Sequence, residues 1–93
     1  MTFMALNLQT EDYDAWKPMF DSDPAGRKQA AKGHMLSRNA DDPNDVFIRV
    51  EFGSVADARA FRERLLASGA LDNPQVTVKM GPTIIEPAEQ ETY

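Results

Sequence analysis

His34 is the only histidine in the chain, and its side chain is the one best suited to move a proton near neutral pH. It stands at the start of a predicted strand, and Glu51 lies in a second predicted strand beyond a short turn. If the two strands pair so that these residues face each other, Glu51 could orient the imidazole and raise its basicity. His34 is therefore a candidate general acid or base. The alternative is a structural histidine paired with a carboxylate.

Two arginines lie in the same pair of predicted strands. Arg49 could stabilise an enolate or anchor a carboxylate, because a guanidinium donates hydrogen bonds to developing negative charge. Arg38 could do the same, but its position beside the turn favours a solvated role. We therefore predict His34 and Arg49 as the catalytic residues.

Three aromatic residues form a stripe on the first predicted helix. Tyr13, Trp16 and Phe20 follow an i, i+3, i+7 spacing, which places them on one helix face. Together they could line a flat apolar pocket for an aromatic ligand, and the alternative is that they are ordinary core residues. We predict these three residues and Glu51 as the substrate-binding set.

Composition excludes several other kinds of site. The chain has no cysteine and one histidine, which disfavours a transition-metal site. Asp41, Asp42 and Asp45 lack the glycine and distal glutamate of a calcium-binding loop, so we expect no metal. No glycine-rich phosphate loop follows a predicted strand, and no cofactor is expected.

Charge and hydropathy also restrict the partners. The net charge of −5 and the pI of about 4.7 disfavour nucleic acid, which requires a basic surface. The segment from Met1 to Thr10 has neither a basic region nor a long apolar run, so we expect no signal peptide and no membrane partner. A cytoplasmic location is the simplest expectation.

The remaining chain alternates between strand and helix signals. The predicted strands are Met1–Leu8, His34–Asn39, Val46–Phe52 and Val76–Met80, and the predicted helices start near Tyr13, Ala25 (to Lys32) and Ser54. This order predicts a single α+β domain over 1–93 with a four-stranded antiparallel sheet and helices on one face. Gly81 and Pro82 are expected to end the last strand. The extension 81–93 then either packs on a partner subunit or is disordered.

The other face of this sheet has no predicted cover. Symmetrical pairing of the central hairpin places Asn39 opposite Val46 and Met35 opposite Val50 under the helices. Val78 and Met80 are expected to share one face of the last strand. The uncovered face is then expected to hold His34, Leu36, Phe47, Arg49 and Glu51. A second copy related by a twofold axis could cover this face, and the alternative is that it is solvated.

The element order, together with four local segments, resembles the dimeric α/β-barrel superfamily, especially small antibiotic-biosynthesis-monooxygenase-like and cyclase-like proteins. The segments are Tyr13–Lys17, Gly33-His34, Arg38–Asn44 and Glu51-Phe52. The resemblance extends to about Met80. It implies a ferredoxin-like protomer that forms a homodimer through its open sheet face and binds an aromatic or polyketide-type molecule.

The function that this resemblance implies is a cofactor-independent monooxygenase or a cyclase. A non-catalytic dimeric small-molecule-binding protein of the same fold is the alternative. A heme-degrading branch of the superfamily uses an Asn on the first strand, a Trp on a later strand and a His on a helix. Asn7 fits, but Trp16 lies on a predicted helix and His34 on a predicted strand, so heme degradation is not expected.

Overall fold

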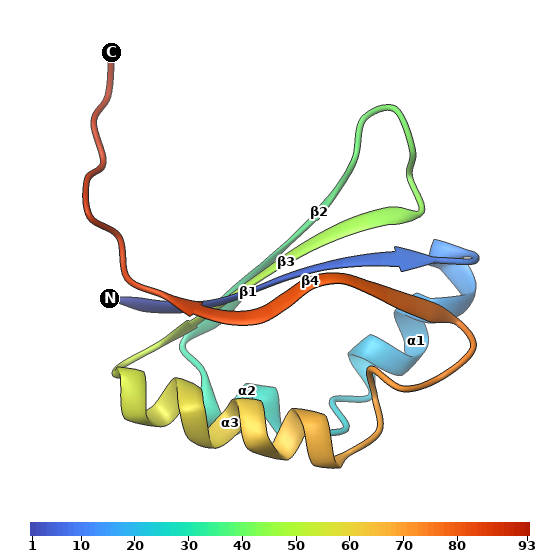
Figure 1. Ribbon diagram of the computed structural model, residues 1–93, viewed down its shortest axis with the longest axis horizontal. Coiled ribbons are helices and arrows are strands. Elements are labelled where there is room, and N and C mark those ends of the chain that lie inside the picture. Colours follow the sequence, from blue (N-terminus) through green and yellow to red (C-terminus); the bar gives the residue numbers. More distant parts are fainter.

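The computed structural model describes all residues, 1–93, as one sheet with helices on a single face (Figure 1). The strands pair antiparallel in the order β2-β3-β1-β4. The elements are β1 (Thr2–Thr10), α1 (Tyr13–Asp21), α2 (Arg27–Ala30), β2 (Gly33–Arg38), β3 (Asp45–Phe52), α3 (Val55–Ala67) and β4 (Val76–Ile85). This confirms the predicted ferredoxin-like α+β fold. No helix is long and apolar enough to cross a membrane.

The core fills the space between the sheet and the helices. Every second residue of β1 is buried, so Met4, Leu6 and Leu8 point toward the helices. The opposing strand β3 buries Val46, Ile48, Val50 and Phe52, and α3 contributes Ala58, Phe61 and Leu65.

Polar side chains set the starts of the helices. The Ser54 hydroxyl accepts a hydrogen bond from the Asp57 amide at 3.1 Å and so caps α3, which starts near the predicted position. The predicted second helical piece is shorter than expected and covers only Arg27–Ala30. Gly26, just before it, has a left-handed backbone with φ +75°, so the helix cannot begin earlier.

The predicted register of the β2–β3 hairpin is wrong by one residue. His34 lies opposite Val50, and Glu51 lies opposite Gly33. The backbone N–H of Asn39 donates a hydrogen bond to the backbone carbonyl of Asp45 at 2.8 Å and closes the turn. Asn39 therefore lies opposite Asp45 rather than Val46. Because side chains alternate between faces, this shift reverses the predicted faces of β2. His34 and Leu36 lie on the helix side.

The last strand is longer than predicted. β4 continues through Gly81 and Pro82 to Ile85, so the expectation that these two residues end the strand is wrong. The β1–β4 register shifts on both sides of Asn7. Val78 therefore lies opposite Leu8 on the helix side, whereas Met80 lies opposite Asn7 on the other side, which corrects the prediction that Val78 and Met80 share a face.

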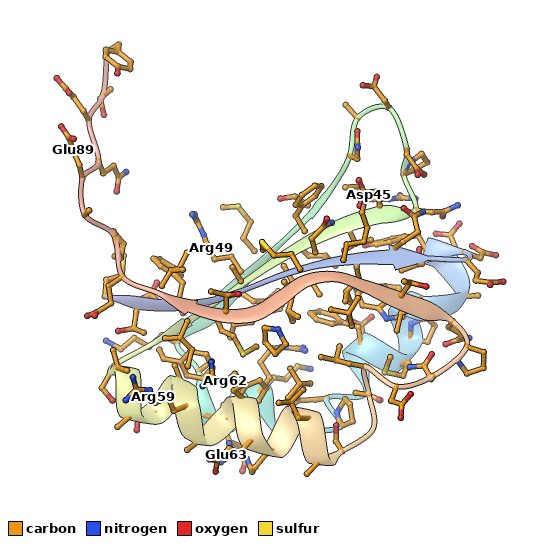
Figure 2. The ribbon with its side chains drawn as sticks, in the orientation of Figure 1. Asp45, Arg49, Arg59, Arg62, Glu63 and Glu89 are labelled. Atoms are coloured by element: carbon orange, nitrogen blue, oxygen red, sulfur yellow. The ribbon has the colours of Figure 1, made fainter.

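The face of the sheet away from the helices is open, and we call it the open face. Arg49 projects from it, on the side opposite to Arg59 and Arg62 of α3 (Figure 2). Three large apolar side chains on this face are strongly exposed: Met35 at 57%, Phe47 at 44% and Met80 at 48%. Residues 86–93 leave the sheet on the same side as an exposed tail (Figure 1).

Candidate functional site: an apolar cavity with a buried arginine

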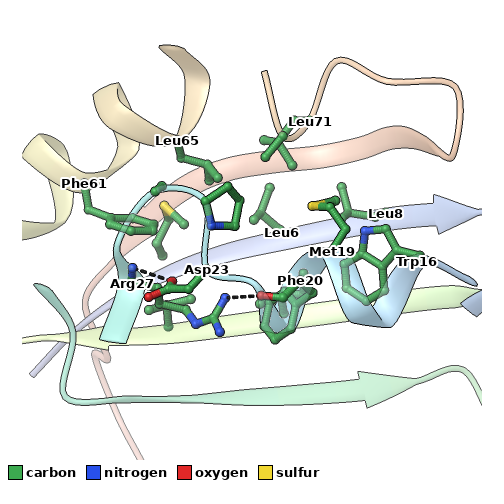
Figure 3. Close-up of a pocket in the computed structure, with 16 residues that line it drawn as sticks. Leu6, Leu8, Trp16, Met19, Phe20, Asp23, Arg27, Phe61, Leu65 and Leu71 are labelled. Atoms are coloured by element: carbon green, nitrogen blue, oxygen red, sulfur yellow. Dashed lines mark hydrogen bonds between the residues drawn. The ribbon is translucent and has the colours of Figure 1, made fainter. Parts of the chain in front are cut away.

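A cavity of about 50 Å³ lies in the layer between the sheet and the helices (Figure 3). Trp16, Met19 and Phe20 of α1 line it, and so does the segment from Asp23 to Ala25 that follows this helix. Most of the other lining residues are apolar: Met4, Leu6, Leu8, Ile48, Val50, Phe61, Leu65, Ala70 and Leu71. Typical small-molecule sites have roughly 300–1,000 Å³, so a ligand of ordinary size requires the cavity to widen.

Arg27 is the one cationic residue that lines this cavity, and it is 6% exposed. Its guanidinium lies over the Phe20 ring, with 3.9 Å between the guanidinium carbon and the ring centroid. One terminal nitrogen, Nη1, donates a long hydrogen bond of 3.4 Å to the Phe20 carbonyl. The buried Nε has no hydrogen-bond partner. The cavity therefore combines an apolar lining with an incompletely satisfied cation.

Asp23 is the acidic residue of the cavity lining, but its carboxylate does not neutralise Arg27. One oxygen accepts from the Arg27 backbone amide at 2.6 Å, and the other accepts from the Lys28 amide at 3.1 Å. The ion pairs of the chain, Lys17–Asp21 and Lys79–Asp45, do not include Arg27. Asp23 thus fixes the start of α2, while the guanidinium keeps its charge.

His34 borders a groove that Arg27 also lines. The groove is lined by Arg27, Lys28, Ala31, Lys32, Gly33 and His34, so Arg27 belongs to both the groove and the cavity. Desolvation lowers the pKa of His34 below its ordinary value of 6.5, and the positive charges of Arg27 and Lys17 lower it further. The imidazole is therefore neutral at pH 7 and able to accept a proton.

The predicted site residues are only partly brought together. Trp16 and Phe20 line the cavity, whereas Tyr13 lies outside it, against Trp16 and beneath the Arg38 guanidinium at 3.8 Å. Arg49 and Glu51 lie on the open face, where the Arg49 guanidinium is 4.7 Å from the Phe3 ring centroid. The expected pairing of His34 with Glu51 is therefore absent, and His34 does not share a face with Arg49, because the hairpin register places His34 on the opposite side of the sheet.

Arg27 is a candidate functional residue that the sequence analysis does not predict. It lies in the predicted helix Ala25–Lys32, beyond a turn in which Asp23 and Gly26 have positive φ. No single helical period therefore connects Arg27 to the aromatic stripe of α1. No group of three histidine or acidic side chains is arranged to hold a metal ion.

Solved structures share this fold. Rv0793 from Mycobacterium tuberculosis aligns with a TM-score of 0.61 and 15% identity, over 99% of this chain and 100% of that one. A protein from Chloroflexus aurantiacus, provisionally named an antibiotic biosynthesis monooxygenase, aligns with a TM-score of 0.64 and 11% identity, over 99% and 98%. A Nitrosomonas europaea protein with the same provisional name aligns with a TM-score of 0.54 and 16% identity, over 96% and 100%.

No family model and no curated protein sequence matches the chain. The structural likenesses therefore define a class of fold. The chain has the ferredoxin-like fold of antibiotic-biosynthesis-monooxygenase-like structures, so the predicted resemblance is confirmed at that level.

Proposed function

We propose that the protein is a small cofactor-independent enzyme, of the monooxygenase or cyclase type, that acts on an aromatic or polyketide-type molecule. The observation that carries this proposal is the apolar cavity between helices and sheet, with Trp16 and Phe20 in its wall. Flat aromatic walls bind flat aromatic ligands by stacking and by exclusion of water. The provisional names of two solved structures with this fold support the same class of chemistry.

The substrate of the oxygenase reaction is an electron-rich phenol, or its keto tautomer, which has a ring methylene group. His34 removes a proton from this substrate. The resulting carbanion bonds to molecular oxygen, and the oxygen–oxygen bond then breaks. One oxygen atom stays on the ring carbon as a carbonyl, and the other leaves as water with the two hydrogens of the methylene group. In the cyclase reaction, the same proton transfer forms an enolate that closes a ring by aldol addition.

We assign the proton transfer to His34 because its imidazole packs against Phe20, a cavity residue, and is neutral at pH 7. Arg27 provides positive charge beside the bound molecule, a role that the sequence analysis gave to Arg49. The groove bordered by both His34 and Arg27 is the proposed mouth of the site.

The assembly that we propose is a twofold dimer joined through the open face. Met35, Phe47 and Met80 expose apolar surface there, and a second copy would bury it without any further partner. The tail 86–93 leaves on the same side and is proposed to contact the partner subunit. A cytoplasmic location remains the expectation for such an enzyme.

The alternative function is a non-catalytic dimer that binds a hydrophobic small molecule. The small number of proton-transferring side chains at the cavity favours it, since Asp23 and Arg27 are the ionisable residues in the lining. Turnover distinguishes this alternative from the enzyme, because both bind ligand in the same cavity.

Trp16 fluorescence and oxygen uptake test the proposal together. Trp16 is the only tryptophan, so polyaromatic phenols that enter the cavity should quench its emission. For an oxygenase, one oxygen molecule is consumed per ketone formed, and His34→Ala should lower turnover by roughly 10²–10⁴-fold while quenching persists. Quenching without turnover by either reaction supports the binding protein. The absence of quenching across a phenol panel overturns both functions.

A further inference from the structure

We infer that Arg27 is a carboxylate-binding residue, and that the cavity takes a small aromatic carboxylic acid. This inference rests on the proposed function, since it names the class of ligand that the cavity would hold. Its starting observation is that Arg27 is only 6% exposed, that its buried Nε has no hydrogen-bond partner, and that its guanidinium has no ion-pair partner. Buried charges in proteins are normally paired, so an unpaired one at a cavity marks a site for an opposite charge.

The pattern of hydrogen bonds at Arg27 shows which donors are free. Nη1 donates to the Phe20 carbonyl, and no other side-chain hydrogen bond of Arg27 is made within the chain. The unpartnered Nε lies on the edge of the guanidinium that can donate two parallel N–H bonds. A carboxylate matches this edge, because its two coplanar oxygens have the same spacing as the two donors.

The acidic side chains near Arg27 are committed to other donors. Asp23 caps α2 through two backbone amides, and Asp21 accepts from Lys17 Nζ at 2.7 and 2.8 Å. Neither carboxylate forms an ion pair with the guanidinium. An acid that arrives from solution therefore meets no competing carboxylate on Arg27.

The surroundings of Arg27 would direct an acidic ligand to it. Although the chain has a net charge of −5, the groove next to the cavity brings together Arg27, Lys28, Lys32 and the ring of His34. Cationic groups that line a groove raise the local concentration of anions. The cavity that Arg27 also lines is apolar apart from Arg27 and Asp23 (Figure 3). The acid group would therefore stay at the groove while the ring enters the cavity.

Nuclear magnetic resonance titrations with benzoate, benzamide and phenol test this inference. The three probes share one ring and differ in the group that Arg27 would meet. Benzoate should bind more tightly than benzamide by about tenfold or more, because hydrogen bonds between charged groups are stronger than those between neutral groups. It should also shift the Arg27 Nε–H signal. Phenol tests the alternative, in which the site prefers a phenolic oxygen to a carboxylate.

Two variants complete the experiment. Arg27→Met should remove the preference for benzoate over benzamide, and Arg59→Met, which removes a charge from the exposed surface of α3, should leave it unchanged. If Arg27→Met does not fold, the wild-type preference and the Nε–H shift decide the matter without it. Equal affinity of the wild type for benzoate and benzamide, or tighter phenol binding, overturns the inference but leaves cavity binding intact. If none of the three probes binds, both the inference and the proposed binding in the cavity are overturned.

Discussion

The imidazole of His34 stands nearly perpendicular to the ring of Phe20, with 5.3 Å between the two centroids and an interplanar angle of 79°. The Arg27 guanidinium also lies on Phe20, so one aromatic side chain contacts both the candidate base and the buried cation. The charge of Arg27 is one reason why the pKa of His34 lies below 6.5, after desolvation, and Asp21 opposes this effect only in part. The protonation of His34 is therefore coupled to Arg27.

The first prediction concerns this coupling. Arg27→Met should raise the pKa of His34 toward 6.5, because it removes a nearby positive charge that disfavours the imidazolium form. Since His34 is the only histidine, its ring proton signals in a pH titration report the value directly. Arg59→Met, on the outer surface of α3, removes the same charge at a distance and serves as the control. An unchanged His34 titration in Arg27→Met would contradict the coupling.

The alternation of β1 was sufficient to predict its buried face. Met4, Leu6 and Leu8 are separated by more polar or smaller residues, so only one orientation buries an apolar row. The faces of β2 were not predictable in this way. Each face of that strand carries one large apolar residue, Leu36 on one side and Met35 on the other, so burial does not select a register. Hydrogen bonds between Asn39 and Asp45 select it instead.

The candidate site was predictable only where it followed helical spacing. Trp16 and Phe20 were found because they share a stripe within one helix. Arg27 lies beyond a turn in which Asp23 has φ +59° and Gly26 has φ +75°, and no periodic pattern specifies how such a turn directs the next helix. The burial of Arg27 depends on the conformation of this turn and on the position of the Phe20 ring. Both are set by tertiary structure.

The second prediction concerns the open face. Phe47→Asp should convert the proposed dimer to a monomer, because it places a charge in the centre of the apolar surface formed with Met35 and Met80. Leu66→Asp is the matched control, since Leu66 is 57% exposed on α3, on the other side of the molecule. Sedimentation velocity measures both variants. A wild-type monomer at micromolar concentration would reject the dimer.

The third prediction concerns acid stability. The carboxylate of Asp45 accepts hydrogen bonds from Asn39, Asn7 and Lys79, which lower its pKa from 3.8 to about 2. Between these two values the unfolded chain binds more protons than the folded chain, so stability falls as the pH decreases. This contribution is complete above pH 3.8 and is lost as the pH falls through about 2.

Asp45→Asn should therefore lower the urea midpoint at pH 7 and flatten its dependence on pH in this acid range. Asp41→Asn is the control, because Asp41 is exposed in the same turn and its carboxylate accepts no hydrogen bond within the chain. Equal acid slopes for Asp45→Asn and the wild type would show that the hydrogen bonds to Asp45 do not stabilise the folded state.

The fourth prediction concerns the close approach of β4 to β1. Gly81 has φ +84°, and a Cβ atom at this position would overlap the backbone carbonyl oxygen of Ala5. Gly81→Ala should therefore lower the free energy of unfolding by roughly 1–3 kcal/mol from backbone strain, with the steric overlap adding to this cost. Gly53→Ala is the matched control, because the nearest atom to its Cβ would be the flexible end of Lys32 at 3.6 Å. That variant should stay within about 0.5 kcal/mol of the wild type.

Urea unfolding of the two glycine variants measures this loss of stability. A second expected effect distinguishes local strain at Gly81 from a general loss of stability. Gly81 directly follows Met80, which lies on the open face, so a displaced strand would also move that side chain. Gly81→Ala should therefore weaken the proposed dimer even under conditions where the protomer remains folded. If both glycine variants unfold at the same urea concentration as the wild type, the close approach between β4 and Ala5 does not exist in solution.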